Sequence, residues 1–114
     1  MKFSPTEPTF MTQFTLARGE AAKRMESAEE TERTVARLVG MLGGSMKTFY
    51  VSQTGAYDGL VIYTFPKNHD SRTFTCLLRS HAGYDRIETT KLMSSADAAM
   101  SARAAKEVEK RLKK

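Results

Sequence analysis

Tyr57 and Asp58 lie where a glycine turn runs into the most apolar stretch of the chain, residues 60–65. Gly55 permits a positive φ angle in that turn. Asp58 can accept hydrogen bonds from turn amides, and Tyr57 can pack its ring against the rim of the fold with its hydroxyl free. The carboxylate could instead orient or deprotonate a small ligand at a pocket mouth, which would require a raised pKa or a basic partner. The turn accounts for both residues without a ligand, and we take Gly55, Tyr57 and Asp58 together as the candidate binding turn.

Five residues are candidates for the lining of a pocket. Arg86 and Glu88 are two apart in an expected strand, so they point to the same side, where they pair with each other or the arginine faces a ligand. Thr12 shares a strand face with phenylalanines and is either a satisfied core hydroxyl or a cavity-lining group. The full set of pocket candidates is Thr12, Tyr50, Tyr63, Arg86 and Glu88.

Metal, redox and nucleophilic chemistry find little support in the sequence. His69 precedes an expected helix and His81 ends one, but neither has a second metal or haem ligand at a diagnostic spacing. Cys76, the single cysteine, is expected to be a packed apolar residue and fits a reducing cytoplasm. The sequence has no phosphate loop, nucleophile elbow or zinc spacing. We therefore expect no catalytic residue, no metal and no cofactor.

The formal net charge of +5 is concentrated in residues 101–114. Basic residues complement the negative end of a helix dipole, so a solvated helix end explains them, and an anionic partner is the alternative. No helix pair that could read DNA precedes the expected domain, and no apolar run approaches the roughly 20 residues of a membrane span. The N-terminus lacks the apolar core of a secretory signal. We expect a cytoplasmic protein without a nucleic-acid or membrane partner.

Apolar alternation predicts four strands, at residues 9–16, 46–53, 60–65 and 84–93. Only Thr64 is polar in the third strand, so both faces of that strand should be covered. In the second strand, Met46 is expected on the face opposite Phe49. In the fourth strand, Tyr84 is expected on the face opposite Ile87.

Three helices are predicted between and after these strands. The first begins at Ser27, where Ser27 and Glu30 can form a capping box, and ends at the pair Gly43-Gly44. The second places Phe74 and Leu78 on its apolar face. The last begins after Ser94 or Ser95, and its apolar stripe is expected to pack on the domain or on a partner copy. That stripe consists of Ala98, Ala102, Ala105, Val108 and Leu112.

The order β-α-β-β-α-β with an added C-terminal helix predicts a ferredoxin-like α+β sandwich with a four-stranded antiparallel sheet. We expect a leader at residues 1–8, the domain at 9–93 and the C-terminal helix at 94–114. In this fold both inner helices cover one sheet face. The other face would expose either Val61 and Tyr63 or the alternate set Leu60 and Ile62. We therefore predict a homodimer in which a second copy covers the open sheet face.

The chain resembles the GYD-domain family from about Phe14 to Met93. The turn Gly55-Ala56-Tyr57-Asp58, followed by an apolar strand that stops at Pro66, resembles the family's Gly-x-Tyr-Asp signature. The other matching segments are Phe14-Thr15 with Gly19, Gly43-Gly44, Lys47-Thr48-Phe49-Tyr50 and Arg86-Ile87-Glu88-Thr89, in which Ile87 replaces a threonine. GYD-domain proteins are a small bacterial family with a dimeric α+β-barrel form of the ferredoxin-like fold.

This resemblance implies a fold and an assembly rather than a reaction, because the family has no established activity. We expect a non-catalytic homodimer that binds a small ligand or serves as an interaction module. The alternative is a cofactor-independent or haem-dependent oxygenase of the kind that uses similar dimeric barrels. Convergent polar groups in a pocket, or a coloured cofactor in the purified protein, would favour the enzyme.

Overall fold

The computed structural model describes residues 7–17, 19, 23, 26–66, 71–80 and 83–113. Its elements are β1 (Thr9–Leu16), α2 (Ala28–Met41), β2 (Ser45–Val51), β3 (Gly59–Thr64), α3 (Ser71–Ser80), β4 (Tyr84–Leu92) and α4 (Ser95–Leu112). The predicted α+β fold with a four-stranded antiparallel sheet and a C-terminal helix is confirmed. Most of the expected leader, His69 and His81 lie outside the described residues.

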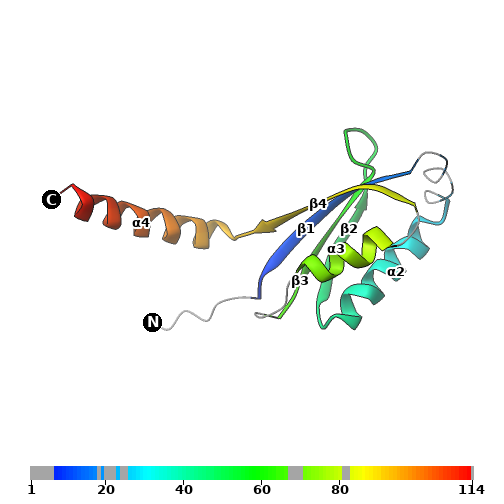
Figure 1. Ribbon diagram of the computed structural model, residues 1–114, viewed down its shortest axis with the longest axis horizontal. Helices are drawn as coiled ribbons and strands as arrows, with labels where there is room; N and C mark the ends of the chain where they lie inside the picture. The colour runs from blue at the N-terminus through cyan, green and yellow to red at the C-terminus, as the bar shows by residue number, and fades with distance from the viewer. Residues whose placement is uncertain are drawn as a thin grey trace.

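The sheet has the strand order β2-β3-β1-β4, and every neighbouring pair is antiparallel. The helices α2 and α3 lie on one face of the sheet (Figure 1). The opposite face, which we call the open sheet face, carries none of the described helices. The consecutive strands β2 and β3 form an antiparallel hairpin, and β1 and β3 occupy the centre of the sheet.

The core lies between the sheet and the two helices. Val61 and Tyr63 of β3 are fully buried there, so Leu60 and Ile62, which alternate with them, lie on the open sheet face. The ring of Tyr63 meets that of Phe74 from α3 edge to face, with 4.7 Å between the ring centroids. The buried apolar residues are Phe10, Phe14, Val35, Val39, Val61, Tyr63, Phe65, Phe74 and Leu78.

Two irregularities in the sheet turn side chains to a face that simple alternation does not predict. A register shift between Met46 and Thr48 places Met46 opposite Tyr63, on the helix-covered face. A second shift in the pairing of β1 with β4 lets Tyr84 pack on the core, edge to face with Phe14. The expected faces of Met46 and Tyr84 are therefore wrong, because one extra residue at a bulge reverses the alternation of the strand.

The ends of α2 follow the sequence in part. The predicted capping box is wrong, since Ser27 caps no backbone amide and its hydroxyl donates to the carbonyl of Lys23, at 3.0 Å. The predicted end of α2 at the glycine pair is confirmed. Glycine is required at the two positions for different physical reasons. Gly43 adopts a left-handed φ of 84°. Gly44 passes so close to the ring of Phe65 and the carbonyl of Thr64 that no Cβ atom fits there.

The C-terminal helix α4 extends away from the sheet beyond the end of β4 (Figure 1). None of its residues is buried, and Val108 and Leu112 are 55% and 79% exposed. The expectation that its apolar stripe packs on its own domain is wrong. Only Met93 and Ser94 separate β4 from α4, and the helix runs on past the end of the strand instead of turning back over the sheet, so its stripe meets no apolar surface of the domain (Figure 1). Packing on a partner copy stays a prediction.

Candidate functional site

Asp58 ties the signature turn to the end of β1. Its Oδ2 atom accepts a hydrogen bond from the backbone amide of Leu16, at 2.7 Å. Its own amide donates to the carbonyl of Phe14, and its carbonyl accepts from the amide of Ser52, each at 2.8 Å. The regular hydrogen-bond ladder between β1 and β3 ends before this point, and the side chain of Asp58 adds one more hydrogen bond between the two segments. The carboxylate therefore has a structural role.

We expect Asp58→Asn to lower the free energy of unfolding by about 1 kcal/mol, because a neutral amide oxygen replaces a charged acceptor. Urea denaturation monitored by circular dichroism measures this change. The matched control is Asp85→Asn on the exposed surface of β4, which should change stability by less than about 0.5 kcal/mol. A clear gain in stability for Asp58→Asn would instead mean that the carboxylate is kept for a ligand at a cost to the fold.

Tyr57 belongs to a cluster with two residues of β4. Its hydroxyl donates to Oε2 of Glu88 at 2.6 Å, so the expectation of a free hydroxyl is wrong. Arg86 lies over the Tyr57 ring, 5.4 Å from the centroid, and its Nη2 atom is 3.6 Å from the same carboxylate oxygen. The hydrogen bond to Glu88 raises the pKa of Tyr57 above its usual value. This contact therefore holds while the phenol is protonated and is lost as the pH rises through that raised pKa.

A chain of hydroxyl groups runs through the helix-covered side of the domain. The Thr12 hydroxyl lies 2.7 Å from that of Tyr63 and 2.9 Å from that of Thr89. The Thr89 hydroxyl in turn lies 3.2 Å from that of Thr75 on α3. Thr12 and Tyr63 are fully buried, whereas Thr75 and Thr89 are half-buried. Burial raises the pKa of Tyr63, which keeps its phenol protonated and able to donate.

The sheet separates the pocket candidates into two groups. Thr12 and Tyr63 lie together on the helix-covered side. Arg86 and Glu88 lie near Tyr57, and Tyr50, which is 65% exposed, is placed on the open sheet face by its pairing with Leu60. The five residues therefore do not form one pocket. The pair Thr12 and Tyr63 connects through Thr89 to a hollow of the domain.

That hollow is an open groove between α3 and β4, with a volume of about 570 Å³. We call it the α3–β4 groove. Thr75 and Thr89, the outer members of the hydroxyl chain, both line it. Its complete described lining is Phe10, Arg72, Thr75, Cys76, Arg79, Ile87, Thr89 and Lys91. Cys76 is exposed in this groove, so the expectation of a packed cysteine is wrong.

Most residues of the groove were missed at the level of sequence, although α3 carries a usable signal. Arg72, Thr75, Cys76 and Arg79 follow the spacing i, i+3, i+4, i+7, which places them on one side of the helix, next to its apolar face. The apolar face of α3 is the stronger pattern in the sequence, and it draws attention away from this neighbouring polar side. Lys91 of β4 gives a weaker signal, because its position on the helix-covered side depends on the register with Phe10.

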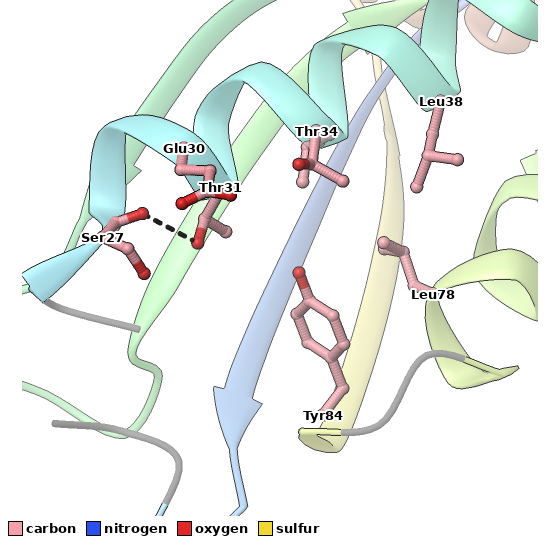
Figure 2. A pocket seen from close by; sticks show the side chains of 8 residues that line it. Ser27, Glu30, Thr31, Thr34, Leu38, Leu78 and Tyr84 are labelled. Atoms are coloured by element: carbon pink, nitrogen blue, oxygen red, sulfur yellow. Dashed lines mark hydrogen bonds between the residues drawn. The ribbon is translucent and has the colours of Figure 1, made fainter. Parts of the chain in front are cut away.

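A second, smaller pocket lies between α2 and the end of α3 (Figure 2). It has a volume of about 220 Å³. The Tyr84 hydroxyl points toward α2 in this view, while Leu38 and Leu78 form the apolar side. The only hydrogen bond drawn among its residues is that from the Thr31 hydroxyl to the Ser27 carbonyl, a contact within one helix turn. The α3–β4 groove, which is larger and continues into the hydroxyl chain, is the better candidate site.

The described part of the chain contains no group of three or more His, Cys, Asp or Glu residues that could hold a metal ion. Within the same residues, no helix is long and apolar enough to cross a bilayer. The hydroxyls and cations of the groove can bind and orient a ligand. None of its described lining residues is a carboxylate or histidine that could act as a general base near neutral pH.

Solved structures with a similar fold share little sequence with this chain. An uncharacterized NIPSNAP-like domain protein from Burkholderia xenovorans matches with a TM-score of 0.50 at 11% identity, over 76% of this chain and 84% of that one. A REP-associated tyrosine transposase bound to a REP hairpin matches with a TM-score of 0.53 at 10% identity, over 89% of this chain and 67% of that one. At such identities these likenesses show the ferredoxin-like fold alone.

The sequence comparisons point to one family. A search of curated protein sequences finds no match. The family model described as the GYD domain matches residues 10–112, a span that includes the signature turn, the groove and the whole of α4. The resemblance seen in the signature turn and the glycine pair is thereby confirmed and extended through the C-terminal helix. The chain belongs to the GYD domain family.

Proposed function

We propose that this protein is a non-catalytic, homodimeric module that binds a small ligand in the α3–β4 groove. The observation that carries the proposal is the hydroxyl chain from Tyr63 to Thr75, whose outer end lies in that groove. Two copies would join through the open sheet face.

The hydroxyl chain supports ligand binding because a packed core does not need it. Thr12 lies at the centre of the sheet between Phe10 and Phe14, where an apolar residue of the same shape would pack without polar partners. Ligand sites combine an apolar lining with a few well-placed polar groups. The groove has this character, since Phe10 and Ile87 supply apolar surface beside the hydroxyls of Thr75 and Thr89.

The open sheet face supports assembly into a dimer. Its central row runs through Thr48, Ile62, Met11 and Thr90, and Leu60 and Tyr50 form the next row with Gln13 and Glu88. The apolar side chains Leu60, Ile62 and Met11 thus lie on the two central strands, and polar side chains occupy the β4 edge, as at the rim of a protein interface. A stable dimer buries about 800 Å² on each partner, which a four-stranded sheet can supply.

The helix α4 supports the same assembly. Its stripe has small residues at Ala98 and Ala105 and larger ones at Val108 and Leu112, all exposed in the single chain. An isolated helix gains little stability in water, and most helices in proteins depend on packing of an apolar face. In a symmetric homodimer, each copy can cover the apolar stripe of the other copy's α4, so one interface would satisfy both helices.

The ligand site can be tested by NMR titration of ¹⁵N-labelled protein with a set of small aromatic carboxylates, amides and alcohols. We expect dose-dependent shifts of the amide signals of Thr75, Ile87 and Thr89. Thr89→Val should weaken binding because it interrupts the hydroxyl chain, whereas Thr90→Val, on the other face of the same strand, should not. Shifts confined to the open sheet face, or none at millimolar concentration, would contradict a ligand site in the groove.

A further inference from the structure

The α3–β4 groove has a strongly biased charge. Arg72, Arg79 and Lys91 line it, and none of its described lining residues carries a carboxylate. We infer that the groove selects an organic anion, with a carboxylate or phosphate head and an apolar body. This inference rests on the proposed ligand-binding function and adds the chemical class of the ligand.

The cations come from both sides of the groove. Arg72 and Arg79 are two turns apart on α3, with Cys76 between them on the same side of the helix. Lys91 stands across the groove on β4, on the helix-covered side, because it pairs in register with Phe10. An anionic head placed between α3 and β4 would therefore meet positive charge from two elements, which an accidental surface patch on one helix does not provide.

Two of the cations are available to a ligand. Within the residues that the structure describes, neither Arg79 nor Lys91 has a carboxylate partner. Arg79 and Lys91 are both exposed residues, so a ligand that enters the groove can reach their positive charges. A bound anion would compensate that charge, and the fork of an arginine suits carboxylate and phosphate groups.

The rest of the groove fits the remainder of such a ligand. Phe10, which is 7% exposed, and the half-buried Ile87 offer apolar contact beside the cations. The hydroxyls of Thr75 and Thr89 can take part in hydrogen bonds with the head group, and the contact of Thr89 with Thr12 holds the Thr89 hydroxyl in place. A volume of about 570 Å³ is in the range of pockets that hold small organic molecules.

Cys76 provides a direct probe, because it is the single cysteine of the chain and is exposed in the groove. Its rate of reaction can be measured with two aromatic disulfides, the dianionic 5,5′-dithiobis(2-nitrobenzoate) and the neutral 4,4′-dithiodipyridine. We expect the ratio of the anionic to the neutral rate to fall about two- to fivefold in Lys91→Met and in Arg79→Gln, as one partly screened charge pair allows. The matched control Lys47→Met, on β2 at the far edge of the sheet, should leave the ratio unchanged.

Protection of Cys76 separates the anion inference from the proposed function. Benzoate should slow the reaction with the neutral disulfide, while benzamide at the same concentration should not. Equal protection by benzamide would overturn the inference but leave a small-molecule site in the groove. If neither Lys91→Met nor Arg79→Gln changes the rate ratio, the anion inference is also overturned. Arg79 lies at an exposed helix position, so Arg79→Gln can still be tested if Lys91→Met does not fold. The NMR titration decides independently whether the groove binds any small molecule.

Discussion

Ile62→Glu is expected to leave the protein monomeric at micromolar concentration. Ile62 lies in the middle of the open sheet face, between Met11 of β1 and Thr48 of β2. In the proposed dimer a glutamate there would be buried without a partner. The loss of about 3–5 kcal/mol that an unpaired buried charge causes corresponds to a dimer weakened by about two to four orders of magnitude.

Sedimentation equilibrium at several protein concentrations measures this effect. The control variant is Thr73→Glu, which adds the same charge at an exposed position of α3 on the helix-covered side. It should remain dimeric. An Ile62→Glu protein that associates as tightly as the original chain would show that the open sheet face is not the interface.

Gly44→Ala is expected to destabilise the domain by about 3 kcal/mol. An added Cβ atom would run into the ring of Phe65 and the carbonyl of Thr64, and the backbone of β3 cannot move aside as a flexible side chain can. Overpacking of this kind typically costs 1–3 kcal/mol, and a clash with backbone belongs at the upper end of that range.

A helical glycine four residues earlier, Gly40, provides the opposite expectation. Gly40 lies on the exposed surface of α2, and a Cβ atom added there meets nothing within 4 Å. Gly40→Ala should therefore raise stability by about 0.5–1 kcal/mol, because alanine favours the helix. Urea denaturation of both variants checks the pair. Equal effects of the two substitutions would mean that α2 does not pack against the end of β3 as described.

The sequence predicts the elements of this fold well because their signals are local. The apolar run 60–65 leads to β3, and the glycine pair leads to the end of α2. The alternation of β1 correctly places Phe10, Thr12 and Phe14 on one face, where all three are buried. Each of these patterns is determined by residues that are neighbours in sequence.

The errors occur where distant parts of the chain decide the outcome. Met46 and Tyr84 change faces because of bulges that depend on the pairing with β3 and β1. The apolar stripe of α4 is real in sequence, but no pattern within the helix says what covers it.

The candidate site was only partly predictable for the same reason. Thr12 and Tyr63 were both chosen from sequence, but their hydrogen bond joins residues 51 positions apart. The link onward to Thr89 and Thr75 depends on the placement of α3 over β4. Lys91 and Arg79 become parts of one groove only after the sheet and the helix have assembled.

Native mass spectrometry of freshly purified protein tests the central claim of a homodimeric ligand-binding module most directly. It reports the number of subunits and any retained small molecule in the same spectrum. We predict a species with twice the chain mass of 12.7 kDa, carrying additional mass from a bound small molecule that is lost on denaturation. A single chain of 12.7 kDa without added mass, at micromolar concentration and low ionic strength, would contradict both the dimer and the ligand.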